Sequence, residues 1–306
     1  MSVENIRLFI QNYEQERPEN SGKIYFSRRM SSKYSTHLPA VSNAVQQGIA
    51  ETVLPYTKGQ LDMNAIVEYN PVGVADGDIE QMKFEVVPRI QEFFDSISDE
   101  NIYKDMGALK IDKIKFYCIV LSVGGKELYL FRQFQKLTKL RKGYMTQIVN
   151  DELVAMETDF LGIDEAVDIV AFDNEIYILN HISLERIFEY KDEFLKKTNE
   201  ALGEILSQNV ISNIEQFADD CCRDVRITKR FTNIMTKGRL PLFFENYDKV
   251  PEIVIELTLD IDFDEDGRLI YREKSQLFHI INLLSDSYFR SLLANRTGIA
   301  KMEEEL

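Results

Sequence analysis

The stretch KFYCIVLSVGGKELYLFRQF, residues 115–134, determines the fold class of this 306-residue chain. Two runs rich in β-branched, aromatic and aliphatic residues, 115–123 and 127–134, are joined through Gly124 and Gly125. Glycine reaches the positive φ angles of a tight hairpin turn without steric cost. The stretch therefore predicts a β-hairpin and, with it, an antiparallel sheet.

A second hairpin is predicted at residues 167–172 and 175–179, across Asp173 and Asn174. Asn180 or Ser183 can cap a long helix that runs to about residue 206. Hydrophobic spacing and turn residues predict further helices at 3–13, 41–53, 79–94, 211–235 and 275–293, and strands at 23–28, 65–69 and 252–263. Hairpins followed by helices indicate an α+β fold, an antiparallel hairpin-built sheet with packed helices. We expect an N-terminal α+β region at 1–110 and a second at 111–306.

Composition places the chain among globular proteins of the cytosol. Hydrophobic residues make up 44% and charged residues 28%, which is ordinary for a folded domain. No apolar run approaches the roughly 20 residues that span a bilayer, and residues 1–15 lack the order of a signal peptide. Three cysteines, two of them adjacent, do not form a disulfide framework.

The net charge of −15 is unevenly distributed. Three segments, 21–50, 128–150 and 225–244, carry fourteen basic residues and no acid, so the rest of the chain carries −29. Local potential counts more than net charge for binding, so an acidic body with basic islands is compatible with a phosphate-binding face. The alternative is that these basic residues lie on separate solvated faces.

The basic segment at 128–142 is the most suggestive, because an aromatic strand that carries Arg132 runs directly into four further cations. The candidate DNA-binding residues there are Arg132, Lys136, Lys139, Arg141 and Lys142. A second candidate patch consists of Arg226, Lys229 and Arg230. Such residues neutralise phosphates and give affinity that does not depend on sequence. The strand's Tyr129, Phe131 and Phe134 are better explained as core than as base-stacking platforms.

Motifs for metal binding and catalysis are weak. Residues 262–273 match a calcium-loop pattern with Glu273 at the closing position, but strands rather than helices are predicted around it, so a hairpin turn explains the same residues. Glu252, Glu256 and Asp260 alternate on a predicted strand and could serve a metal-dependent nuclease, or form its solvated face. The three histidines have no metal-ligand spacing, and the cysteines fit packed hydrophobes. We therefore expect no catalytic residues, metal or cofactor.

From about residue 113 onward the chain resembles the KwaB-like family of the Kiwa anti-phage defence system. The strings that carry this resemblance are LYLFRQF (128–134), VDIV (167–170), IYILN (176–180), LERIF (184–188) and LSDSYFRS (284–291). Before them, Asn70-Pro71 also falls where such a dipeptide is expected, whereas Leu184 stands where an aromatic residue is expected.

The resemblance implies an antiviral protein without catalytic residues. It implies that the protein binds DNA and acts with a membrane-embedded KwaA-like partner to block phage replication. The protein would be cytoplasmic and recruited through that partner to the inner face of the cell membrane, and we expect a homodimer. Two alternatives stay open: an acidic protein-interaction subunit with no nucleic-acid role, and the metal-dependent nuclease.

Overall fold

The computed structural model describes residues 2–19, 21–31, 33–73, 77–98, 100–105, 109–134, 146–149, 152–155, 162–291 and 296–300. The chain divides into two compact units: unit 1 is Met1–Glu68 with Ala75–Glu189, and unit 2 is Tyr69–Val74 with Tyr190–Leu306. The division expected at residue 110 does not coincide with this one, because residues 116–133 form the centre of the unit 1 sheet.

Unit 1 is built on an eight-stranded sheet of order β2-β1-β5-β6-β9-β10-β4-β3. Its strands are β1 (Gly22–Arg29), β2 (Tyr34–His37), β3 (Ile66–Glu68), β4 (Ile79–Lys83), β5 (Phe116–Val123), β6 (Lys126–Gln133), β9 (Ile169–Phe172) and β10 (Glu175–Ile178). All neighbours pair antiparallel except β3 and β4. Both predicted hairpins are confirmed, and their turn residues take positive φ angles: Gly124, Gly125, Asp173 and Asn174.

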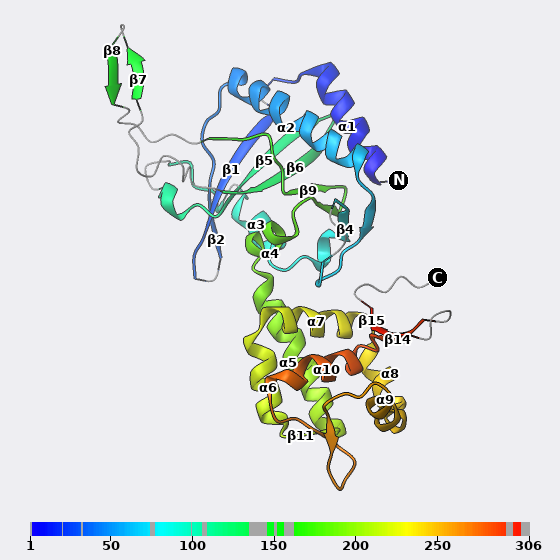
Figure 1. Cartoon of the computed structure of the whole chain (residues 1–306). Helices are drawn as coiled ribbons and strands as arrows, with labels where there is room; N and C mark the ends of the chain where they lie inside the picture. Colours follow the sequence, from blue (N-terminus) through cyan, green and yellow to red (C-terminus); the bar gives the residue numbers. More distant parts are fainter. Residues whose placement is uncertain are drawn as a thin grey trace. The chain divides into compact units, whose positions relative to one another are not determined.

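Helices cover both faces of this sheet (Figure 1). On one face, α1 (Ser2–Glu16) and α2 (Asn43–Met63) bury Ile6, Ile10 and Val53 against sheet residues such as Ile119 and Leu130. On the other, the rings of Phe93, in α3 (Ile90–Ser96), and Phe188, at the end of α4 (His181–Ile187), pack on Phe116 and Phe131. The α+β class is therefore confirmed. Short elements complete the unit: η1 (Phe84–Val86), η2 (Ile111–Lys113), β7 (Thr146–Val149) and β8 (Glu152–Ala155).

Unit 2 is mainly helical, with its own hydrophobic core. Its helices are α5 (Tyr190–Gln208), α6 (Ile214–Arg223), α7 (Val225–Thr236), α8 (Arg239–Glu245), η4 (Tyr247–Lys249), α9 (Val250–Glu256) and α10 (Lys274–Leu284). Its short strands are β11 (Ile211–Ser212), β12 (Asp262–Phe263), β13 (Leu269–Ile270), β14 (Tyr288–Arg290) and β15 (Thr297–Ile299). Ile227, Thr228, Phe231 and Ile234 of α7 are buried, whereas Arg226 on the same helix is exposed.

The helix expected at 79–94 is wrong over its first half. Residues 79–83 form β4, which pairs with β10, and the helix begins only at Ile90. Ile79 and Glu80 are both buried there, and Pro88 separates the strand from the helix. Cross-strand pairing therefore overrides the local helical pattern.

The long strand expected at 252–263 is also wrong. Residues 250–256 form α9, which has Pro251 in its first turn, and only Asp262 and Phe263 are in a strand. Val250 and Val254 are buried four residues apart, whereas Ile255 is 77% exposed. The β-branched residues thus follow a helical period, because one side of α9 packs on the core.

Two other helices are shorter than expected. The helix capped by Asn180 ends near Phe188, and Glu189, with φ of 53°, separates it from α5. The C-terminal helix ends at Leu284, before β14. Among the described residues, the structure has no helix with both the length and the apolar composition needed to cross a membrane.

Candidate nucleic-acid interface

The first basic segment and its neighbours in unit 1 form an ion-pair cluster. Glu189 lies 3.2 Å from the Arg29 Nε and 2.7 Å from an Arg89 nitrogen, and it also accepts a hydrogen bond from Lys115. Burial alone would raise the pKa of the Glu189 carboxyl, but the hydrogen bond from Lys115 and the three cations lower it below its ordinary value. The charge of Arg29 is therefore used to join parts of the fold.

Arg132 has a similar role. Its guanidinium donates to Asp168 at 2.8 Å and to Asp164 at 2.7 Å and 3.1 Å, and its side chain is only 13% exposed. Asp168 is 1% exposed and also accepts the backbone N–H of Gln133 at 2.6 Å. Burial opposes the charge on Arg132, but the hydrogen bond to Asp164 and the attraction of both carboxylates raise its pKa. Arg132 is thus bound on two sides by acids. The other candidates of that segment, Lys136, Lys139, Arg141 and Lys142, lie outside the described residues.

The second candidate patch lies on α7 in unit 2. Arg226 is exposed and pairs with Asp224, which caps the helix. The Lys229 ammonium lies 5.8 Å from the centre of the Phe194 ring. Arg230 is half-buried, and it donates to the Asn282 amide oxygen at 2.5 Å, with its guanidinium 5.9 Å from the centre of the Phe278 ring.

Arg230 also lines a small polar hollow, which we call the α7–α8 hollow. Its lining residues are Asn70, Val72, Arg230, Asn233, Ile234, Lys237, Arg239, Ser285, Ser287 and Ala300. None of these described residues is acidic. Burial lowers the pKa of Arg230 from its ordinary value, because desolvation disfavours the charged form. The hollow therefore brings three cations of the segment 225–244 beside hydroxyl and amide groups.

The hollow joins residues that are far apart in the sequence. Lys237 and Arg239 belong to the basic segment 225–244 but are not among the predicted site residues, because nothing in the sequence indicates which cations converge. Ser285 and Ser287 come from the string LSDSYFRS, and Asn70 from the Asn-Pro dipeptide. Apart from the family resemblance, no pattern in the sequence predicts that either string contributes to a site.

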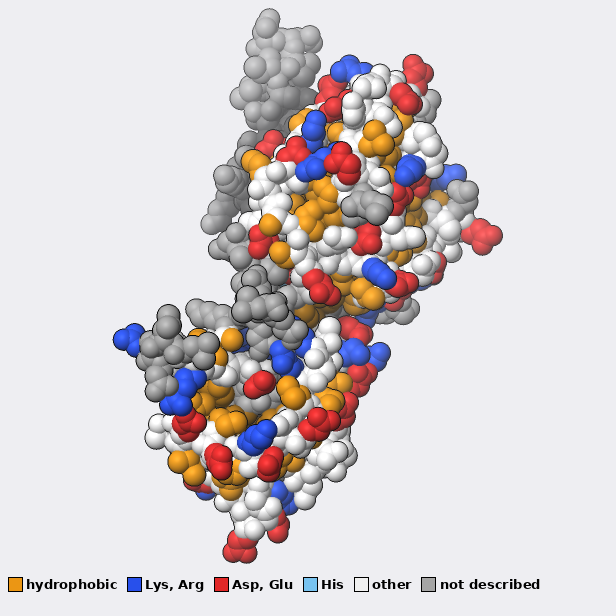
Figure 2. Space-filling model, turned by 90° about the vertical axis from the view of Figure 1, so that its right-hand side faces the viewer, with side chains coloured by type: hydrophobic (Ala, Val, Ile, Leu, Met, Phe, Trp, Pro, Cys, Tyr) orange, Lys and Arg blue, Asp and Glu red, His pale blue; other side chains and the backbone are white. Residues whose placement is uncertain are grey.

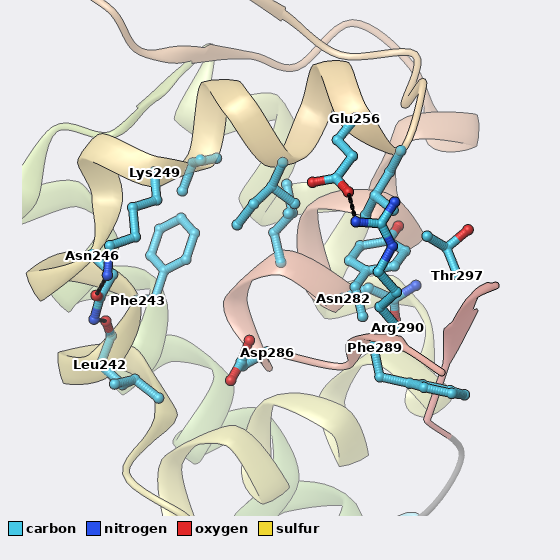
Figure 3. Close-up of a pocket in the computed structure, with 15 residues that line it drawn as sticks. Leu242, Phe243, Asn246, Lys249, Glu256, Asn282, Asp286, Phe289, Arg290 and Thr297 are labelled. Carbon is cyan, nitrogen blue, oxygen red and sulfur yellow. Dashed lines mark hydrogen bonds and ion pairs between the residues drawn. The ribbon is translucent and has the colours of Figure 1, made fainter. Parts of the chain in front are cut away.

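One face of the surface is of mixed charge. Figure 2 shows Lys and Arg side chains interspersed with Asp and Glu on the face it draws, rather than gathered into one basic surface. A larger pocket of unit 2, of about 460 Å³, is also lined by side chains of both charges. Figure 3 shows apolar side chains of α8 and α9 along it, and the Glu256–Arg290 ion pair of 2.8 Å between α9 and β14.

The structure does not support the metal-dependent nuclease site considered from the sequence. Glu252 and Glu256 lie on the helix α9 rather than alternating with Asp260 on a strand, and Glu256 pairs with Arg290. Among the described residues, no three His, Cys, Asp or Glu side chains are grouped as metal ligands.

The calcium-like loop forms a hairpin turn, as expected, between the antiparallel strands β12 and β13. Asp264 accepts backbone N–H groups of Asp266 and Arg268 there, while Glu273 caps α10. Cys118 and Cys221 are buried in the cores of their units, as expected for packed hydrophobes.

Comparison with known proteins gives one match. A family model described as Kiwa protein KwaB-like matches residues 111–294, which begin at η2 in unit 1 and extend past the LSDSYFRS string in unit 2. No curated protein and no solved structure matches the chain.

Proposed function

The chain belongs to the Kiwa protein KwaB-like family and is a component of Kiwa anti-phage defence, and from this premise we propose that it acts by binding DNA rather than by transforming it. Contacts to the phosphate backbone would supply the affinity, largely without regard to sequence. Binding along viral DNA would then obstruct the enzymes that replicate it.

The observation that carries this proposal is the α7–α8 hollow. Its cations, Arg230, Lys237 and Arg239, come from one basic segment, and its described lining contains no acid. Arg226 and Lys229 extend the same segment along α7. Lys136, Lys139, Arg141 and Lys142 are proposed as a second contact. Arg132 is left out, because Asp164 and Asp168 already engage its guanidinium.

The family also supports a proposal about partners. We infer a KwaA-like membrane protein that recruits the chain to the inner face of the cell membrane. A homodimer would present two copies of each basic segment to one duplex, so that contacts of the two copies reinforce each other.

Fluorescence anisotropy of labelled duplex DNA between about 50 and 200 mM salt tests the proposal. One variant carries Arg226→Gln, Lys229→Gln and Arg230→Gln; another carries Lys136→Glu, Lys139→Glu, Arg141→Glu and Lys142→Glu. Arg272→Gln removes an exposed cation elsewhere in unit 2 and is the matched control. We expect salt-sensitive binding by the wild-type chain and the control, and weakened binding by both variants. Absence of binding at the lowest salt would refute the proposal for the isolated chain.

The net charge favours a second candidate. At −15, with acids interspersed on the surface, the chain also suits a protein-interaction subunit that docks a basic partner. That candidate leads if DNA binding is absent while a partner protein is retained in a salt-sensitive way.

A further inference from the structure

The larger pocket of unit 2, which we call the α9 pocket, has the size and lining of a small-molecule site. Its volume is about 460 Å³, within the range of about 300 to 1,000 Å³ that is usual for ligand sites. Its walls come from α8, α9, α10 and the β14–β15 hairpin. The apolar lining residues are Leu242, Phe243, Val250, Ile253, Leu257, Leu283, Tyr288 and Phe289. The pocket therefore suits a ligand with an apolar body.

One helix forms the long wall of the pocket. Val250, Ile253 and Leu257 follow one another at helical spacing along α9 and its C-terminal end. The charged residues Lys249 and Glu256 flank this stripe, and seven residues of helix span about 10 Å. Figure 3 shows Lys249 towards one end of the pocket and Glu256 towards the other. The pocket thus suits an extended chain better than a compact group.

Fixed groups close the end of the pocket at Glu256. This carboxylate pairs with Arg290 at 2.8 Å and so joins α9 to β14. The neighbouring Phe289 lies opposite Gly298 in the β14–β15 pair, and a Cβ at residue 298 would lie only 2.8 Å from the Phe289 ring. Glycine at 298 therefore allows the ring to lie directly against the backbone. The ring is 51% exposed, yet the hairpin holds it beside the pocket.

The charges of the lining favour an anion at the opposite end. Glu256 and Arg290 compensate each other, and Asp286 has interactions of its own. The Lys249 ammonium donates to the neutral amide oxygen of Asn246 at 2.7 Å, and among the described residues it pairs with no carboxylate. An ammonium has three donors, so Lys249 can bind an anionic oxygen and keep this contact.

We propose that the α9 pocket binds one anionic amphiphile, a medium-chain carboxylate. Its carboxylate contacts Lys249, and its chain lies along Val250, Ile253 and Leu257. Burial of each methylene adds affinity through the hydrophobic effect, while the single charge fixes the direction of the chain. The proposal is independent of DNA binding, because the lining residues of this pocket differ from those of the α7–α8 hollow.

Isothermal titration calorimetry of the full-length chain with hexanoate, octanoate and decanoate tests the length of the pocket. We expect one site, with affinity rising about fourfold per methylene until the chain fills the pocket. Decylamine, with the same chain and a positive charge, tests the sign, and decanoate should bind at least fivefold more tightly. This control is stringent, because the net charge of −15 attracts cations to the chain as a whole.

Variants separate the charge contact from the apolar wall. Lys249→Gln removes the charge, so it should weaken decanoate at least fivefold and leave decanol, the uncharged analogue, unchanged. Phe289→Ala removes the ring and Gly298→Ala displaces it, so each should weaken both ligands at least threefold. Arg272→Gln removes an exposed cation outside the pocket and should bind both ligands as wild type does. Thermal denaturation without ligand checks that each variant is folded.

Four results would overturn the proposal. Decylamine that binds as tightly as decanoate contradicts an anion site. Several decanoate molecules per chain, or affinity that rises without limit to tetradecanoate, shows adsorption to the surface. Folded Phe289→Ala and Gly298→Ala variants that bind as wild type does place the ligand outside the pocket. Flotation of the wild-type chain with phosphatidylcholine vesicles, abolished in Lys249→Gln, assigns the apolar wall to a membrane surface instead.

Discussion

The two units use arginine in opposite ways. In unit 1, Arg132 lies between Asp164 and Asp168, and Arg29 lies between Glu92 and Glu189. In unit 2, Arg230 is half-buried, and it donates to the neutral amide of Asn282. A buried cation that already has carboxylate partners stabilises the fold, whereas one held by neutral groups retains attraction for an external anion.

The difference shows that basic segments of a sequence do not identify phosphate-binding surfaces by themselves. All of these arginines lie in or beside runs that lack acids. The acids that neutralise Arg132 come from 32 and 36 residues further along the chain. Only the folded arrangement separates structural cations from available ones.

The largest effect is expected from breaking the unit 1 pairs. Arg132→Ala leaves the buried Asp168 carboxylate without its cation, which costs about 3 to 5 kcal/mol of unfolding free energy. Urea denaturation measures this loss. Arg223→Ala, which breaks the exposed pair with Asp219, is the control and should cost under about 1 kcal/mol. A stable Arg132→Ala protein that has lost DNA binding would reverse the assignment of this residue.

A pH-dependent effect of nearly that size is expected at His181. Burial alone would lower its pKa, but hydrogen bonds to Glu185 and the buried Glu80 raise it to about 9. A histidine with a raised pKa stabilises the fold fully below its unfolded value near 6.5, and this contribution is lost as pH rises towards 9. The expected loss is at most about 3 kcal/mol.

Denaturation of the wild-type chain and of His181→Gln at pH 6 and pH 9 measures this contribution to stability. The variant should lose most of the difference between the two pH values. A wild-type stability that stays constant or rises over this range would contradict the raised pKa.

A smaller effect on stability is expected in unit 2. Arg230→Gln should cost only about 1 kcal/mol of unfolding free energy, because the new amide can still donate to Asn282 and no buried carboxylate is left behind. The same urea titration as for Arg132→Ala tests this directly. A loss of 3 kcal/mol or more would place Arg230 among the structural cations and remove the contrast between the units.

The smallest effect concerns the exposed end of α7. Arg226→Gln and Lys229→Gln should each reduce the slope of log affinity for DNA against log salt by about 1, if each contacts a phosphate. An unchanged slope in the double variant would confine the DNA contact to the hollow and the 136–142 segment.

The sequence predicts the sheet better than the site. Gly124-Gly125 and Asp173-Asn174 predict both hairpins because turn geometry is a local property. Residues 79–83 and 250–256 are mispredicted because pairing with β10 and packing of one side of α9 are long-range effects. The hollow combines residue 70, residues 230–239 and residues 285–287, a convergence that no local pattern contains.

The most direct test of the contrast between the units compares two triple variants for affinity to duplex DNA at about 100 mM salt. One carries Arg230→Gln, Lys237→Gln and Arg239→Gln in unit 2. The other carries Arg29→Gln, Arg89→Gln and Lys115→Gln in unit 1, and both are first checked for folding by circular dichroism. We expect at least tenfold weaker DNA binding by the unit 2 variant, with the unit 1 variant, where folded, within about twofold of wild type. Equal losses in both, or a loss in the unit 1 variant alone, would contradict the assignment of DNA binding to unit 2.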